Sequence, residues 1–275
     1  MLSNFEPPSY SDMAKMHIGY CKKSLNMSKY ASSTAVLFEL GATPIDHKAY
    51  SLAIKYWLRL TRGTKNKLLN ETYKENVKIK SEWVQSIEAM LCINGFRNIW
   101  AEPSLANHET FHRDFKKRLD DQYIQNIREK INNSNRFDIS KLISSKDGKF
   151  TRQTYIDKIV NPQIREYFTR LRIDMNPLES SATKKNKSET NGVCKICTAG
   201  LPETVNHLIL ECSKFSQERN ELLLKLNQSD TQTNVNTLSS SKLLTYIINL
   251  ECPNTCVKIC CKFINTIYNS RKEID

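Results

Sequence analysis

The 275-residue sequence has little glycine and no long apolar run. Only 7 glycines are present, and no segment shows the valine-rich alternation that is typical of a β-sandwich or a large sheet. No apolar stretch approaches the roughly 20 residues that a membrane-spanning helix needs. These absences predict a mainly α-helical chain that does not cross a membrane.

The N-terminus lacks the features of a secretory signal. Its first residues, "MLSNFEPPSYSDMAK", have neither a basic start nor an apolar core. The nine cysteines are odd in number and irregularly spaced, unlike a disulfide framework. We therefore expect reduced thiols and a nuclear or cytoplasmic location, and we do not expect secretion.

Basic residues outnumber acidic residues in the sequence. The chain has 41 Lys and Arg against 29 Asp and Glu, which gives a formal net charge of +12 and a pI near 9.2. A basic excess of this size attracts polyanions at long range. Nucleic acid is the first candidate partner and an anionic membrane surface the second, while the alternative is that the lysines serve only solubility.

The order of composition along the chain predicts five parts. Residues 1–12 are expected to be a flexible lead-in, and residues 13–175 a basic helical domain. A stretch rich in Ser, Lys and Asn at 176–192 is expected to be a linker. Residues 193–227 form a cysteine-containing module, and two helices are expected within 228–275. The other expected helices cover residues 13–25, 33–40, 48–62, 68–77, 82–93, 108–130, 151–160, 163–172 and 213–226.

The clearest helical pattern covers residues 48–62. Its apolar residues recur at the spacing of one helix face, and they are Ala53, Tyr56, Trp57 and Leu60. Basic residues recur at the same spacing on the other side, and they are Lys55, Arg59 and Arg62. This basic stripe is either an ordinary solvated face or a surface that contacts phosphates.

Four further basic residues are candidate nucleic-acid contacts. Arg165 and Arg172 form a line beside the apolar residues of segment 163–172, and Lys184 and Lys185 lie in the expected linker.

In segment 108–130 a different pattern appears, because apolar residues recur every four positions. They are Phe111, Phe115, Leu119 and Tyr123, and this spacing favours a core face over a base-stacking platform.

The stretch "CKICTAGLPETVNHLILEC" has the spacing of a metal site. Cys194, Cys197, His207 and Cys212 form the pattern C-x2-C-x9-H-x4-C. Cys-x-x-Cys supplies two thiolates from one tight turn, whose backbone N–H groups can stabilise the sulfurs. Pro202 is expected to begin a helix that carries His207, with Cys212 near its end. Four such ligands predict one structural Zn²⁺ with no open position for water activation.

The cysteines could also serve purposes unrelated to zinc. The four residues could be unconnected cysteines and a surface histidine, and a redox Cys-x-x-Cys would need a βαβ context that this chain lacks. A second group, Cys252, Cys256 and Cys260 with the adjacent Cys261, could bind metal or react with oxidants. Because buried free cysteine behaves as a small hydrophobe, a core stripe is the favoured interpretation of this group.

The extended motif "CKICTAGLPETVNHLILECSKFSQER" resembles the zinc-binding motif near the C-terminus of non-LTR (LINE-type, jockey-like) retrotransposon reverse transcriptases. Its acidic, aromatic and arginine positions match Glu203, Phe215 and Arg219. Upstream, "AVLFELGATPIDHKAYSLAIKYWLRL" resembles a segment that follows the polymerase domain, and "GFRNIW" and "FKKRLDDQYIQNI" resemble later segments. The resemblance covers residues 16–271, although Ile127 stands where the family often has tryptophan.

The resemblance implies a non-catalytic region downstream of the polymerase, present here as a fragment or a degenerate copy. Such a region would bind template RNA or target DNA and would be stabilised by zinc. The only adjacent aspartates, Asp120 and Asp121, follow Arg118 and Leu119 rather than the aromatic residue of a catalytic turn. An active polymerase fragment or nuclease is therefore disfavoured, and the remaining alternative is a helical protein-interaction scaffold with a structural zinc clip.

Overall fold

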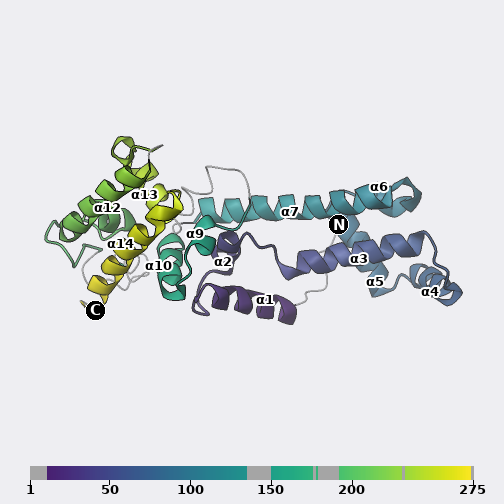
Figure 1. The fold of residues 1–275 in the computed structure, drawn as a ribbon. Helices are drawn as coiled ribbons and strands as arrows, with labels where there is room; N and C mark the ends of the chain where they lie inside the picture. The colour runs from purple at the N-terminus through teal and green to yellow at the C-terminus, as the bar shows by residue number, and fades with distance from the viewer. Residues whose placement is uncertain (1–10, 135–149, 176–177, 179–191, 231–232, 274–275) are drawn as a thin grey trace. The chain divides into compact units, whose positions relative to one another are not determined.

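The computed structural model describes residues 11–134, 150–175, 178, 192–230 and 233–273 (Figure 1). Within these residues the structure is built from helices, and the only β pairing is one isolated bridge between Val193 and Pro202. The prediction of a mainly α-helical chain is therefore confirmed for the described part. None of the helices in these ranges is both long and apolar enough to span a membrane.

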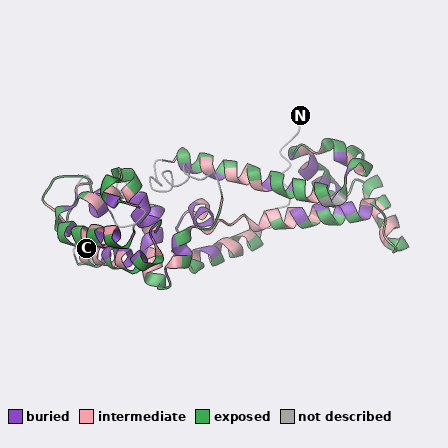
Figure 2. Cartoon of the chain, turned by 45° about the horizontal axis from the view of Figure 1, so that its top comes forward, coloured by how far each residue is buried: buried purple, intermediate pink, exposed green. Residues whose placement is uncertain are grey.

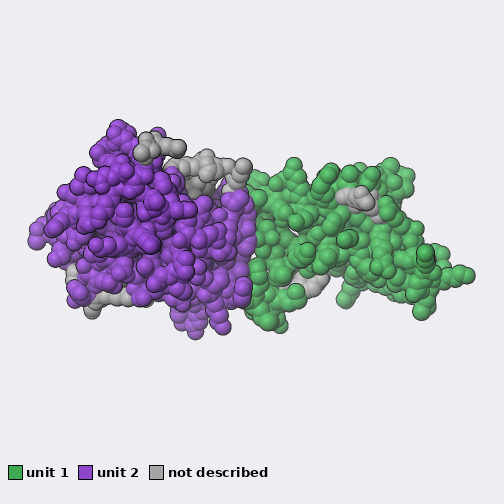
Figure 3. Space-filling model, in the orientation of Figure 1, with its two compact units in different colours: residues 1–18, 43–126 green, residues 19–42, 127–275 purple. Residues whose placement is uncertain are grey.

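Contacts along the chain define two compact units, which Figure 3 colours separately. Unit 1 comprises Met1–Ile18 and Thr43–Asn126, and unit 2 comprises Gly19–Ala42 and Ile127–Asp275. Helices α1 (Ser11–Ser24) and α7 (His108–Asn132) each contribute residues to both units. The boundary between the units does not coincide with the expected linker at 176–192, most of which lies outside the described residues.

Besides its parts of α1 and α7, unit 1 contains α3 (Ile45–Thr61), α4 (Lys67–Lys78), α5 (Glu82–Ile93), α6 (Arg97–Ala101) and the short 3-10 turn η1 (Pro103–Leu105). Helix α3 corresponds to the clearest helical pattern of the sequence, at residues 48–62. Side-chain caps set the starts of two of these helices, because Asn66 accepts a hydrogen bond from Leu69 N and Ser81 accepts one from Val84 N. The expected helices at 68–77 and after Ser81 are thus present.

The core of unit 1 lies between α3, α5, α6 and α7. Buried side chains include Trp57 on α3, Ile87 on α5, and Phe111 and Phe115 on α7. Phe96 meets the ring of Phe111 edge-on, with ring centres 5.1 Å apart. The four-residue repeat in segment 108–130 is therefore a core face, as predicted.

Unit 2 is also assembled from helices and short helical turns, and Figure 2 shows their buried faces. These elements are α2 (Ser33–Leu40), α9 (Thr154–Lys158), α10 (Pro162–Arg172), the π-helical turn η2 (His207–Glu211), the 3-10 turn η3 (Ser213–Phe215), α12 (Ser216–Ser229), the 3-10 turn η4 (Val235–Thr237), α13 (Ser240–Ile248) and α14 (Asn254–Lys272). Helix α14 packs against both α10 and α12. Tyr167 on α10 stacks on Tyr268 of α14, with ring centres 4.1 Å apart.

Helix α2 ends at Gly41, where the backbone of residues 151 and 152 passes close to the glycine. Its φ of +57° is the left-handed conformation of a helix C-cap. A Cβ atom added here would lie 2.3 Å from Arg152 N and 2.4 Å from Thr151 C. Because residues 151–153 pass against the end of α2 as a non-helical segment, α9 is shorter than the helix predicted over 151–160.

The cysteine group near the C-terminus is part of the core of unit 2. Cys252, Cys256 and Cys260 are each at most 1% exposed, and Cys261 is 9% exposed. The Sγ atoms of Cys252 and Cys260 lie 4.0 Å apart, and none of the nine cysteines, all of which are among the described residues, forms a disulfide. The structure thus agrees with the interpretation of this group as a core stripe.

Candidate metal centre

Four residues from two parts of unit 2 meet at one point. Each of Cys194, Cys197, His207 and Cys212 offers one ligand atom, and these atoms all lie within 4.8 Å of one another. The Sγ atom of Cys197 is 3.3 Å from Nε2 of His207. The predicted C-x2-C-x9-H-x4-C set is therefore brought together, and it could hold one metal ion.

A small hairpin positions the first two cysteines. Cys194 N donates to Leu201 O and Glu203 N donates to Gly192 O, both at 2.8 Å, around the bridge between Val193 and Pro202. In this antiparallel arrangement Pro202 occupies the pair that exchanges no hydrogen bonds, so its missing N–H leaves no unsatisfied partner. The expectation that Pro202 begins a helix is wrong, because it belongs to the hairpin.

The other two ligands lie at the ends of the π-helical turn η2, which begins at His207 and is followed by Cys212 as its C-cap. Cys212 N donates to His207 O at 2.6 Å, which closes the five-residue ring of a π-helix. In an α-helix two residues five positions apart would point about 140° away from each other. The wider π turn reduces this angle, and it lets His207 and Cys212 face the same ion. The sequence alone predicted an ordinary helix here.

Burial and backbone donors act on the three thiols in opposite directions. Burial raises the pKa of Cys212 to about 12 and also raises the pKa of Cys194, even though the N–H groups of Cys197 and Ile196 lower it. For the half-buried Cys197, the effect of burial is outweighed by the Ala199 N–H group and by the neighbouring thiols, so its pKa is lowered. Turn amides therefore stabilise thiolate charge, as the Cys-x-x-Cys spacing predicted.

The second nitrogen of the histidine also has an acidic neighbour. His207 is only 2% exposed, and its Nδ1 lies 3.7 Å from Oε2 of Glu211. A carboxylate behind a ligating imidazole orients the ring and raises its basicity. Glu211 was not singled out from the sequence, although its position four residues after His207 on a helical turn was the available signal.

Three residues that the resemblance includes support the site from outside. Arg219 Nη1 donates to the carbonyl oxygen of Cys212 at 3.1 Å, and Phe215 is 1% exposed. Glu203 forms a buried ion pair with Arg271 on α14, with Oε1 and Nε 3.0 Å apart. These contacts join the hairpin and η2 to α12 and α14.

The residues predicted to contact nucleic acid differ in how far they are exposed to solvent. Lys55, Arg59 and Arg62 are exposed along α3 and at its C-cap, and no ion pair to them is found among the described residues. Arg165 is half-buried on α10. Lys184 and Lys185 lie outside the described residues.

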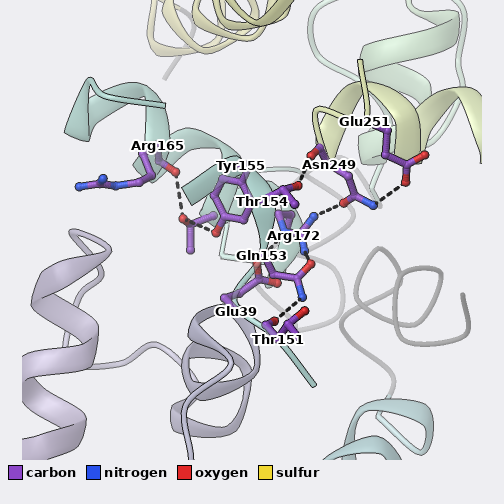
Figure 4. Close-up of polar contacts among 10 residues, drawn as sticks. Glu39, Thr151, Gln153, Thr154, Tyr155, Arg165, Arg172, Asn249 and Glu251 are labelled. Atoms are coloured by element: carbon purple, nitrogen blue, oxygen red, sulfur yellow. Dashed lines mark hydrogen bonds and ion pairs between the residues drawn. The ribbon is translucent and has the colours of Figure 1, made fainter. Parts of the chain in front are cut away.

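Arg172 does not lie on the surface as predicted. It is completely buried, with Nε donating to Oε2 of Glu39 at 2.6 Å and Nη2 donating to Oε1 of Gln153 at 2.7 Å (Figure 4). Its Nη1 donates to Oδ1 of Asn249, and its guanidinium lies 4.7 Å from the centre of the Tyr155 ring. A side chain enclosed in this way cannot reach a phosphate, so its prediction as a nucleic-acid contact is wrong.

The position of Arg172 within α10 explains the error. It follows the buried Phe168 by four residues and the buried Leu171 by one, so it lies on the apolar face of the helix. Spacing from Arg165 alone suggested a basic line, whereas the neighbouring apolar residues indicated burial.

No protein-family model, curated protein or solved structure matched this chain in the comparisons.

Proposed function

We propose that the four-residue cluster binds one structural Zn²⁺. Tetrahedral zinc, with bonds of about 2.3 Å to sulfur and 2.0–2.1 Å to nitrogen, implies ligand–ligand distances of about 3.8 Å between sulfurs and 3.6 Å between sulfur and nitrogen. The Cys197 Sγ to His207 Nε2 distance of 3.3 Å is close to the second value, and the upper limit of 4.8 Å on every pair is compatible with both after a small adjustment of the side chains. Three thiols and one imidazole are also the donor set that zinc prefers in structural sites.

We further propose that the chain is the zinc-stabilised, non-catalytic C-terminal region of a retrotransposon reverse transcriptase, and that it binds RNA or DNA. The observation that supports binding most directly is the exposed row Lys55, Arg59 and Arg62, which has no ion-pair partner in the described ranges. These charges add to a net charge of +12. Cations that are not already neutralised can exchange with the counterions of a phosphate backbone.

Salt dependence tests this role. Binding of the zinc-loaded chain to a labelled duplex should weaken steeply with salt, with a slope of log K against log salt of about 0.9 for each phosphate contact. Replacing Lys55, Arg59 and Arg62 together by Gln should reduce that slope by about 2.7, the contribution of three contacts. Titrations by fluorescence anisotropy at several salt concentrations measure both quantities.

The matched control removes the same number of charges elsewhere. Lys15, Lys74 and Lys78 each lie in an exposed ion pair, with Asp12, Glu71 and Glu75 respectively. Their triple Gln variant should change the slope much less. Equal effects of the two triple variants would contradict the assignment to α3, and no binding even at low salt would favour the protein-interaction scaffold. Primer extension by the chain would contradict a non-catalytic role.

A further inference from the structure

A cavity lined by three aromatic rings lies between α3, α4 and α5 of unit 1. Its volume is about 300 Å³. The lining side chains come from three helices of unit 1, and they include Tyr56 and Leu60 on α3, Leu69, Tyr73 and Asn76 on α4, and Trp83 on α5. The core of unit 1 does not fill this space, although Tyr73 and Trp83 pack against that core.

Two of the rings that line the cavity are arranged to receive a flat group. Tyr56 and Trp83 meet edge-to-face, with ring centres 6.0 Å apart and an angle of 67° between their planes. An edge-to-face pair leaves the faces of one ring uncovered by its partner. Tyr56 is 42% exposed, so a molecule from solution can reach its ring.

A polar group also lies on the wall of the cavity. The amide nitrogen of Asn76 donates to Thr72 O at 2.8 Å, within the same helix. This bond uses the donor side of the amide and leaves its oxygen able to accept a hydrogen bond. An apolar, aromatic pocket with an amide acceptor on its wall suits a heteroaromatic ring that carries an N–H group.

Helix geometry places the cavity next to the basic row. Successive residues of an α-helix are rotated by about 100°, so Tyr56 and Leu60 project about 100° around the axis from Lys55 and Arg59. The basic row therefore occupies the face of α3 adjacent to the face that lines the cavity. This charge favours a ligand that joins an aromatic group to a polyanion, and it disfavours an apolar peptide side chain.

We propose that this cavity takes an unpaired base of a single-stranded nucleic acid, whose phosphates lie along Lys55, Arg59 and Arg62. The inference rests on the proposed nucleic-acid binding and specifies the substrate as single-stranded at this point. Stacking on aromatic side chains beside a basic groove is the general means of binding single strands without sequence preference. A duplex keeps its bases stacked inside and cannot fill the cavity.

Removal of the bases provides the test. The zinc-loaded full chain is titrated with a short single-stranded DNA of mixed sequence and with an abasic strand of the same length. Tyr56→Leu should weaken binding of the base-bearing strand about tenfold, the loss of one stacked base, and should leave binding of the abasic strand unchanged. Tyr56→Phe keeps the ring and should bind both strands like the wild type.

A control variant makes the same change at another exposed tyrosine. Tyr20 on α1 is 73% exposed, and Tyr20→Leu should alter neither affinity. Unfolding midpoints should be similar for the three variants. An equal loss for both strands in Tyr56→Leu, or no loss, overturns the base pocket. If the wild type binds the two strands equally and with steep salt dependence, the pocket is wrong while nucleic-acid binding stands; if it binds neither, both proposals fail.

Discussion

Buried Arg172 connects four parts of unit 2 at the scale of single residues. Glu39 comes from α2, Gln153 precedes α9, and Asn249 follows α13, while Arg172 itself is on α10. Charged groups taken out of water require partners for every donor and for the opposite charge. The arginine supplies this cation to Glu39, which is 0% exposed. Its role is therefore to join elements inside the unit.

Arg172→Met should destabilise unit 2 by about 3–5 kcal/mol, because it leaves the Glu39 carboxylate buried without its cation. Adding Glu39→Leu to this variant should recover part of the loss, since the uncompensated charge is then absent. Chemical denaturation followed by circular dichroism measures both free energies of unfolding.

The same substitution at Arg165 provides the comparison on the same helix. Arg165 is half-buried, and no ion pair to it is found in the described part of the chain. Arg165→Met should change the free energy of unfolding by less than about 1 kcal/mol. If Arg172→Met costs no more than Arg165→Met, the buried pair does not stabilise unit 2.

At the scale of elements, α3 and α7 of unit 1 meet through two histidines. His112 Nε2 lies 3.0 Å from Oγ of Ser51, and His47 Nδ1 lies 3.6 Å from Oδ1 of Asp120. Burial lowers the pKa of His47, while Asp120 and Asp46 oppose this effect without reversing it. The folded unit thus binds a proton at His47 less readily than the unfolded chain does.

This difference predicts how unit 1 responds to acid. Because the folded pKa of His47 lies below its usual 6.5, the unfolded state takes up more protons as the pH falls below that value. The contribution of His47 is fully favourable above about pH 7 and is lost on acidification, by at most about 1.4 kcal/mol per pH unit. His47→Gln should reduce the pH dependence of the unfolding free energy between neutral and mildly acidic conditions.

Asp120→Asn is the informative partner variant. It removes a carboxylate that raises the pKa of His47, so the folded pKa should fall further and the loss of stability on acidification should increase. A smaller loss in Asp120→Asn than in the wild type would contradict the assignment, because it would mean that the carboxylate does not raise the pKa of His47.

Elements also show where prediction from sequence succeeds and where it stops. Helix α2 has its predicted bounds because Ser32 and Gly41 mark both ends with local chemistry. The four candidate metal ligands were predictable because their spacing, C-x2-C-x9-H-x4-C, is typical of a zinc site. The π turn at His207 was not predictable, since the spacing of His207 and Cys212 fits the end of an ordinary helix equally well. The apolar neighbours of Arg172 on α10 indicated its burial, but its partner Glu39 could not be predicted because it is 133 residues away.

At the scale of the whole molecule, the candidate metal centre belongs to one of the two units. All four ligands lie in unit 2, and the buried pair between Glu203 and Arg271 ties the hairpin to α14. Helix α14 in turn packs on α10 and α12. The core around Trp57 and Phe115 in unit 1 includes none of these residues. Loss of the proposed zinc ion is therefore expected to act first on unit 2.

Cys197→Ser should lower the metal content from about one Zn²⁺ per chain and destabilise unit 2, because metal binding contributes directly to the stability of the part that forms the site. Amide hydrogen exchange should quicken in residues 192–273 and in α10, while exchange in α3 and α5 should stay close to that of the wild type. Treatment of the wild type with a chelator should produce the same pattern.

The control is Cys92→Ser, which alters a thiol of unit 1 outside the cluster and should keep both the metal and the slow exchange of unit 2. Because unit 1 has its own aromatic core, faster exchange throughout α3 and α5 in Cys197→Ser would mean that the two units fold as one.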